Sequence, residues 1–142
     1  MKLKLRNEMI VPSIEFLQGA ELKGKFSRAR SKLVTLLLDS LKELQESEME
    51  LVKEYGETDE NGELIKDDKG NPQLSKDNIV KYNLEHAQLV SEIAEVEGGT
   101  YTDHATDCKQ FLEDYDKALS GKEAQAYDVL LDALEYEESE GK

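Results

Sequence analysis

The fold is decided by residues 27–55, which read SRARSKLVTLLLDSLKELQESEMELVKEY. Apolar residues recur in this stretch at intervals of three, four or seven, the spacing of one face of an α-helix. Gly56 follows directly and is typical of a helix end. We therefore expect one long amphipathic helix over residues 25–56, with an apolar face formed by Leu33, Leu37, Leu41, Leu44, Leu51 and Tyr55.

The segments on either side predict a mainly α fold with a minor β element. Residues 1–24 read as a strand and a short helix, because residues 2–6 alternate charged and apolar side chains and Pro12 suits a first helical turn. Residues 92–97 also alternate and are candidates to pair with the N-terminal strand. We expect a single domain, 1–142, a compact helical bundle around the long helix. Its other parts are a loop or small hairpin (57–75), a helix then a strand (76–97), two C-terminal helices (102–138) and a frayed tail (139–142).

Length and composition exclude several classes of protein. The chain has 142 residues, 38% of them hydrophobic, which is enough to bury a core without a disulfide or metal staple. Cys108 is the one cysteine, so no internal disulfide is expected. No apolar run approaches the about 18 residues that a membrane-spanning helix needs, and we expect a soluble protein with no membrane partner.

Charge is distributed unevenly along the chain, whose formal net charge is −14. Residues 1–32 carry eight Lys and Arg against three Glu, whereas residues 33–142 carry ten against twenty-nine Asp and Glu. An acidic body repels nucleic acid phosphates and anionic lipid, and it attracts basic surfaces. We therefore expect no direct DNA binding by this body, and a basic protein as its partner.

The long helix carries an acidic stripe opposite its leucines. At about 100° per residue, the carboxylates fall within about 80° of one another. Neighbours three or four residues apart lie about 5–6 Å from each other, comparable to phosphates along a nucleic acid strand. The stripe is a candidate partner-binding surface that imitates a nucleic acid backbone; the alternative is an ordinary solvated helix face. It comprises Asp39, Glu43, Glu46, Glu50, Glu54 and Glu57.

A basic cluster precedes the long helix and extends into its first turns. Cations there oppose the helix dipole, which favours anions at a helix N-terminus. A bound phosphate or nucleotide would account for them. The alternative is that they pair with the acidic body, within the chain or across an oligomer interface. The cluster comprises Lys23, Lys25, Arg28, Arg30 and Lys32.

Metal and catalytic sites have little support in the sequence. His104 and Cys108 are four residues apart with Asp103 and Asp107 close by, but Cys108 lies among apolar positions, so we expect a buried structural cysteine and no metal or other cofactor. The aspartate-rich turns after Gly56 lack the bidentate glutamate of a calcium loop. The sequence has no nucleophile elbow, phosphate-binding loop or dinucleotide motif, so we expect no catalytic residue and no enzyme.

Several short motifs lie in order along most of the chain. They are Met1-Lys2-Leu3-Lys4-Leu5-Arg6-Asn7 with Ile10-Val11-Pro12, Leu22-Lys23-Gly24-Lys25 with Arg28-Ala29-Arg30, Tyr55-Gly56 with Glu60-Asn61-Gly62, Val96-Glu97-Gly98-Gly99-Thr100-Tyr101, and Tyr127-Asp128 with Leu130-Leu131. In these motifs the chain resembles an uncharacterised family, a domain of unknown function, of small acidic proteins from tailed phages and prophages of Gram-positive bacteria. The resemblance implies a viral origin and no activity, and no catalytic residue carries over from it.

These observations predict a phage-encoded, non-enzymatic binding protein in the bacterial host cytoplasm. Its acidic surface would inhibit a basic, nucleic-acid-binding host defence factor. One alternative is an accessory structural or assembly protein of the phage tail, associated with the virion and forming homo-oligomers through opposite charges. A second alternative is a binder of a small anionic nucleotide at the basic cluster.

Overall fold

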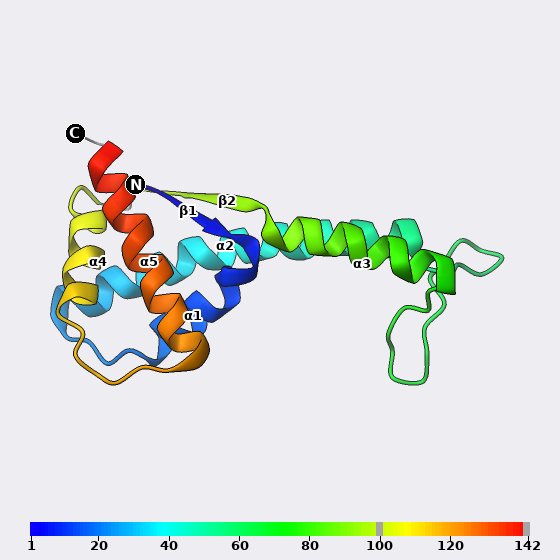
Figure 1. Cartoon of the computed structure of the whole chain (residues 1–142), viewed down its shortest axis with the longest axis horizontal. Helices are drawn as coiled ribbons and strands as arrows, with labels where there is room; N and C mark the ends of the chain where they lie inside the picture. The colour runs from blue at the N-terminus through cyan, green and yellow to red at the C-terminus, as the bar shows by residue number, and fades with distance from the viewer. Residues whose placement is uncertain (99–100, 141–142) are drawn as a thin grey trace. The chain divides into compact units, whose positions relative to one another are not determined.

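The computed structural model describes the backbone of residues 1–98 and 101–140, and side chains as far as residue 137. Two residues of the Val96–Tyr101 motif, Gly99 and Thr100, and the last two residues of the predicted tail therefore lie outside the described residues. The fold is mainly α with a two-stranded antiparallel sheet, as predicted (Figure 1). The long helix is confirmed as α2 (Gly24–Tyr55).

The chain forms two compact units. Unit 1 consists of Met1–Leu41 and Ile93–Lys142, and unit 2 consists of Lys42–Glu92. Helix α2 contributes residues to both units. This division describes compactness alone, and the single domain expected over 1–142 stays a prediction.

The sheet of unit 1 pairs the two strands that the alternating patterns predict. Strand β1 (Lys2–Arg6) runs antiparallel to β2 (Ile93–Glu97), with Leu3 opposite Val96. Leu3 and Leu5 are buried, whereas the charged residues that alternate with them are exposed, because alternate side chains of a strand point to opposite faces. On the exposed face, the Lys2 ammonium lies 3.2 Å from a Glu95 carboxylate oxygen and 3.4 Å from one of Glu97.

The core of unit 1 is helical. A short 3-10 turn (Asn7–Met9) leads from β1 into α1 (Ile10–Gly19), and α5 (Gly121–Glu140) packs against α1, β1 and α4 (His104–Glu113). Leucines from several helices are fully buried here, and Phe16 meets Tyr115 and Tyr127 edge-on at ring-centroid distances of 5.3 and 6.0 Å. The buried leucines include Leu17, Leu33, Leu37, Leu112 and Leu130.

Unit 2 is a helical hairpin made of residues 42–55 of α2 and α3 (Lys76–Ser91), lying along each other (Figure 1). Ser75 caps α3, because its hydroxyl accepts a hydrogen bond from the Asn78 amide at 3.2 Å. The Asn78 side chain donates to the Tyr55 carbonyl (3.0 Å), and His86 Nε2 lies 2.7 Å from a Glu48 carboxylate oxygen. The start of α3 thus meets the end of α2, so the two segments are antiparallel.

The connection between these helices contains the same turn twice. In the first, Asp59 Oδ1 accepts hydrogen bonds from the amides two and four residues later, at 2.9 and 3.0 Å. In the second, Asp67 Oδ1 does the same at 2.9 Å for both. Gly62 and Gly70 occupy equivalent positions with φ of 80° and 83°, a conformation that favours glycine. The loop or small hairpin expected over 57–75 therefore contains two tight turns, each closed by an isolated bridge.

Candidate acidic interface

The acidic stripe consists of exposed side chains. Asp39 lies in the part of α2 that belongs to unit 1. Unit 2 holds Glu43, Glu46, Glu50 and Glu54 on α2, and Glu57 just beyond the end of the helix. Within the part of the chain that the structure describes, none of these carboxylates has a Lys or Arg nitrogen within 4.0 Å.

Helix α3 and Glu92, the residue directly after it, bring further carboxylates beside the stripe. A groove of about 230 Å³ runs between the two helices of unit 2, and Glu85 and Glu92 line it opposite Glu50 and Glu54. Its other lining residues are Ser47, Leu51, Gln88 and Leu89. We call this the acidic groove. Sequence reasoning missed Glu85 and Glu92, because only the antiparallel register of the hairpin brings them next to the stripe.

The carboxylates of unit 2 contribute to raised pKa values of two tyrosines. Partial burial raises the pKa of Tyr55, and the charges of Glu54 and Glu85 raise it further. Burial likewise raises the pKa of Tyr82, with an added contribution from Glu48. In both cases the carboxylates oppose formation of the phenolate, as like charges do.

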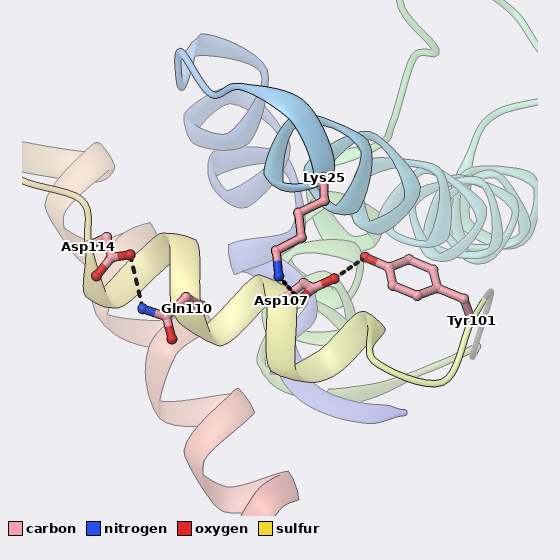
Figure 2. Close-up of polar contacts among 5 residues, drawn as sticks. All are labelled: Lys25, Tyr101, Asp107, Gln110 and Asp114. Atoms are coloured by element: carbon pink, nitrogen blue, oxygen red, sulfur yellow. Dashed lines mark hydrogen bonds and ion pairs between the residues drawn. The ribbon is translucent and has the colours of Figure 1, made fainter.

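Lys25 of the basic cluster has an ionic partner within unit 1. Figure 2 shows Asp107 on α4 between Lys25 and Tyr101. The Lys25 ammonium lies 3.7 Å from Asp107 Oδ1, and the Tyr101 hydroxyl donates a hydrogen bond to Oδ2 at 2.9 Å. Asp107 is only 8% exposed, so this pairing balances a nearly buried charge. One turn further along α4, Gln110 donates to Asp114 in a separate, exposed contact of 2.9 Å.

Burial, followed by the hydrogen bond to Asp107 and the charge of Asp107, raises the pKa of Tyr101 to about 12. The ring of Tyr101 also receives the Arg28 guanidinium, whose carbon lies 5.9 Å from the ring centroid. The same ring stacks on His104 at a centroid distance of 5.1 Å. The start of α2 is thus joined to α4 by an aromatic and ionic network.

Arg30 reaches in a different direction. Its guanidinium donates to the carbonyls of Leu17, at 3.0 Å, and Ala20, which are among the carbonyls at the C-terminal end of α1. Lys23 is exposed and Lys32 is half-buried. The structure therefore engages Lys25, Arg28 and Arg30 in contacts within unit 1 and does not gather the five cations around one point.

His104 and Cys108 both face the backbone of α2. His104 Nε2 lies 2.9 Å from the carbonyl oxygen of Ala29, and the Cys108 thiol donates to the same oxygen at 3.7 Å. Burial, with a smaller contribution from Asp107, raises the pKa of Cys108 to about 12, so the thiol stays protonated and unreactive. Among the described residues, no group of three or more His, Cys, Asp or Glu side chains is placed to hold a metal ion.

A model of the family described as "Protein of unknown function (DUF1617)" matches residues 2–142. The chain belongs to this family. This match confirms the prediction that the chain belongs to a family of unknown function. A phage origin of the chain stays a proposal. Searches of curated proteins and of solved structures find no match to this DUF1617 chain. In the described part of the chain, no helix is both long and apolar enough to cross a membrane.

Proposed function

We propose that this protein is a phage-encoded, non-enzymatic binding protein whose acidic surface engages a basic, nucleic-acid-binding host protein and inhibits it. The observation that carries the proposal is the exposed set Glu43, Glu46, Glu50 and Glu54, which have no Lys or Arg nitrogen within 4.0 Å among the described residues. Glu85 of α3 and Glu92, directly after α3, lie beside them. The contact residues are Glu43, Glu46, Glu50 and Glu54, with Glu85 and Glu92 added by the hairpin.

Charge arithmetic supports a basic partner. Residues 42–92 contain fourteen Asp and Glu against six Lys, a net charge of −8. Like charges three or four residues apart on a helix destabilise it by a few tenths of a kcal/mol per pair. A basic surface that occupied the stripe would remove this repulsion and would be drawn to it over the Debye length, about 8–10 Å at physiological salt.

The resemblance to proteins of tailed phages and prophages supports a phage origin and a bacterial host protein as the partner. A phage protein of this kind would work in the host cytoplasm, where nucleic-acid-binding defence factors act. A carboxylate surface that occupies their phosphate-binding groove would block them without catalysis.

The test is capture from a Gram-positive bacterial lysate on the immobilised full chain, followed by elution with duplex DNA. We expect basic nucleic-acid-binding proteins to be retained and then displaced by the DNA, because both compete for one groove. A quadruple Gln variant, Glu43→Gln, Glu46→Gln, Glu50→Gln and Glu54→Gln, should lose this capture. A matched control, equally neutralised in unit 1, should keep it; its changes are Glu15→Gln, Asp116→Asn, Asp128→Asn and Glu135→Gln. Equal capture by both variants would refute the proposal.

The two alternative functions both rest on the basic cluster, and contacts within unit 1 weigh against them. Lys25 and Arg30 already have partners inside the unit, which leaves fewer cations for a nucleotide or a second copy. A tail-assembly protein would form salt-labile oligomers, which light scattering at low and high salt would detect. A nucleotide binder would show a thermal shift with cyclic or dinucleotides that disappears in Arg28→Ala.

A further inference from the structure

Helix α3 has an apolar face that points away from its partner helix. The residues that contact α2 include Asn78 and His86, and at about 100° per residue Leu89 shares their side of the helix. Val80 and Leu84 lie on the opposite side and are 59% and 69% exposed. Ala87, three residues later, is exposed on that same side. This spacing of four and three residues makes a continuous apolar stripe on a helix surface.

Unit 2 buries little of its apolar surface. Of its residues 42–92, all of which the structure describes, Leu44 is the one buried apolar side chain, and α3 has no buried residue. Helices in proteins gain most of their stability from packing an apolar face. A partner that covered the exposed apolar face of α3 would therefore stabilise unit 2.

The charge of unit 2 favours a basic partner over a second copy of the chain on the exposed face of α3. A second copy would bring another net charge of −8 against the first, which disfavours pairing of two hairpins. A basic partner gains from the same field. Glu85 follows Leu84 directly, so its side chain points about 100° around α3, toward the acidic groove that it lines with Glu50 and Glu54.

We infer that the exposed face of α3 is the seat of a basic amphipathic helix of the partner, an inference that rests on the proposed function. The apolar side of that helix covers Val80, Leu84 and Ala87. Its flanking Lys and Arg side chains extend past Gln88, a lining residue of the acidic groove, to the groove carboxylates. Helix docking supplies affinity through apolar burial, and the groove supplies selection for positive charge.

The test uses a labelled synthetic helix of about 18 residues, or five turns, built from Leu at positions i, i+3, i+4 and i+7 with Lys elsewhere. A scrambled peptide of the same composition has no apolar face. Binding to the full chain is followed by fluorescence anisotropy. We expect Val80→Ser with Leu84→Ser to weaken binding of the amphipathic peptide by about tenfold or more. Val11→Ser with Leu38→Ser, a control pair of exposed apolar residues in unit 1, should leave it within about twofold.

Several results would overturn the inference. Equal binding of the scrambled peptide, or an unchanged affinity in the Val80→Ser, Leu84→Ser variant, would show that α3 does not seat a helix. A dimer of the wild-type chain that this variant converts to a monomer would assign the face to a second copy.

The quadruple Gln variant separates this inference from the proposed function. If it weakens binding while the α3 variant does not, helix docking fails and the acidic interface stands. If neither variant changes binding, both fail. Circular dichroism of each variant confirms that the exposed substitutions leave the helices intact.

Discussion

Arg30 is expected to stabilise unit 1 by binding the end of α1. Its guanidinium Nη1 donates to the carbonyls of Leu17 and Ala20, and Nη2 donates to the Ser27 hydroxyl at 3.3 Å. A hydrogen bond to a charged group contributes about 1.5–3 kcal/mol, and a cation at a helix C-terminus adds a favourable interaction with the dipole. Because Arg30 is half-buried, water can partly replace it. We therefore expect Arg30→Ala to lower the free energy of unfolding by about 2 kcal/mol.

Urea unfolding followed by circular dichroism measures this loss. Lys32→Ala is the matched control, because it removes a neighbouring charge of the same cluster and should change stability by less than about 0.5 kcal/mol. Arg30→Lys should fall between the two, since one ammonium cannot reproduce the fork of a guanidinium. Equal stabilities of Arg30→Ala and Lys32→Ala would refute the capping role. A loss seen only with phosphate present would instead assign Arg30 to an anion site.

Three further outcomes follow from unit 1. The raised pKa of Tyr101 favours the neutral phenol in the folded chain, so the stability that this phenol contributes is present below pH 10.0 and is lost as pH rises toward about 12. Urea unfolding and tyrosinate absorbance across this pH range measure the effect. Asp107→Asn should lower the pKa of Tyr101, because the Asp107 charge raises it. Cys108 should react slowly with a thiol reagent in the native chain and rapidly in urea, since burial keeps it protonated; fast native labelling contradicts this. Phe16→Ala should cost about 3–5 kcal/mol of stability in denaturant unfolding, whereas Tyr136→Ala, at a residue 53% exposed, should cost under about 0.5 kcal/mol; similar costs would contradict the packing described.

The elements with a strong local pattern were predictable. The periodicity of Leu33, Leu37 and Leu44 predicts α2, and all three side chains are buried. The alternation around Leu3 and Leu5 predicts β1 and the face it buries. In each case the pattern of side chains along one segment states both the element and its inward face, so no knowledge of the neighbour is needed.

The buried face of helix α3 was not predictable from the sequence pattern. Its apolar residues predict a helix, and the helix is present. Val80 and Leu84 are exposed, however, and the polar residues Asn78 and His86 form hydrogen bonds to α2. Which face of a helix packs depends on the partner, and a mixed composition leaves more than one choice. The sequence pattern therefore predicts the element and does not predict its buried face.

Part of the candidate site was also predictable from the sequence, and part was not. The carboxylates of one helix form a stripe that helical geometry predicts, and the structure exposes them all. Glu85 and Glu92 join them through a contact between helices, which no spacing along one segment reveals. The same holds for Asp107, whose partners Lys25 and Tyr101 come from distant or adjoining segments.

Hydrogen–deuterium exchange of the full chain, alone and with the captured basic partner, would show directly whether unit 2 is the binding surface. We expect slower exchange in residues 42–55 and 76–91 on binding, with little change around residues 23–32 and in α4. Protection at the basic cluster with unit 2 unchanged would contradict it.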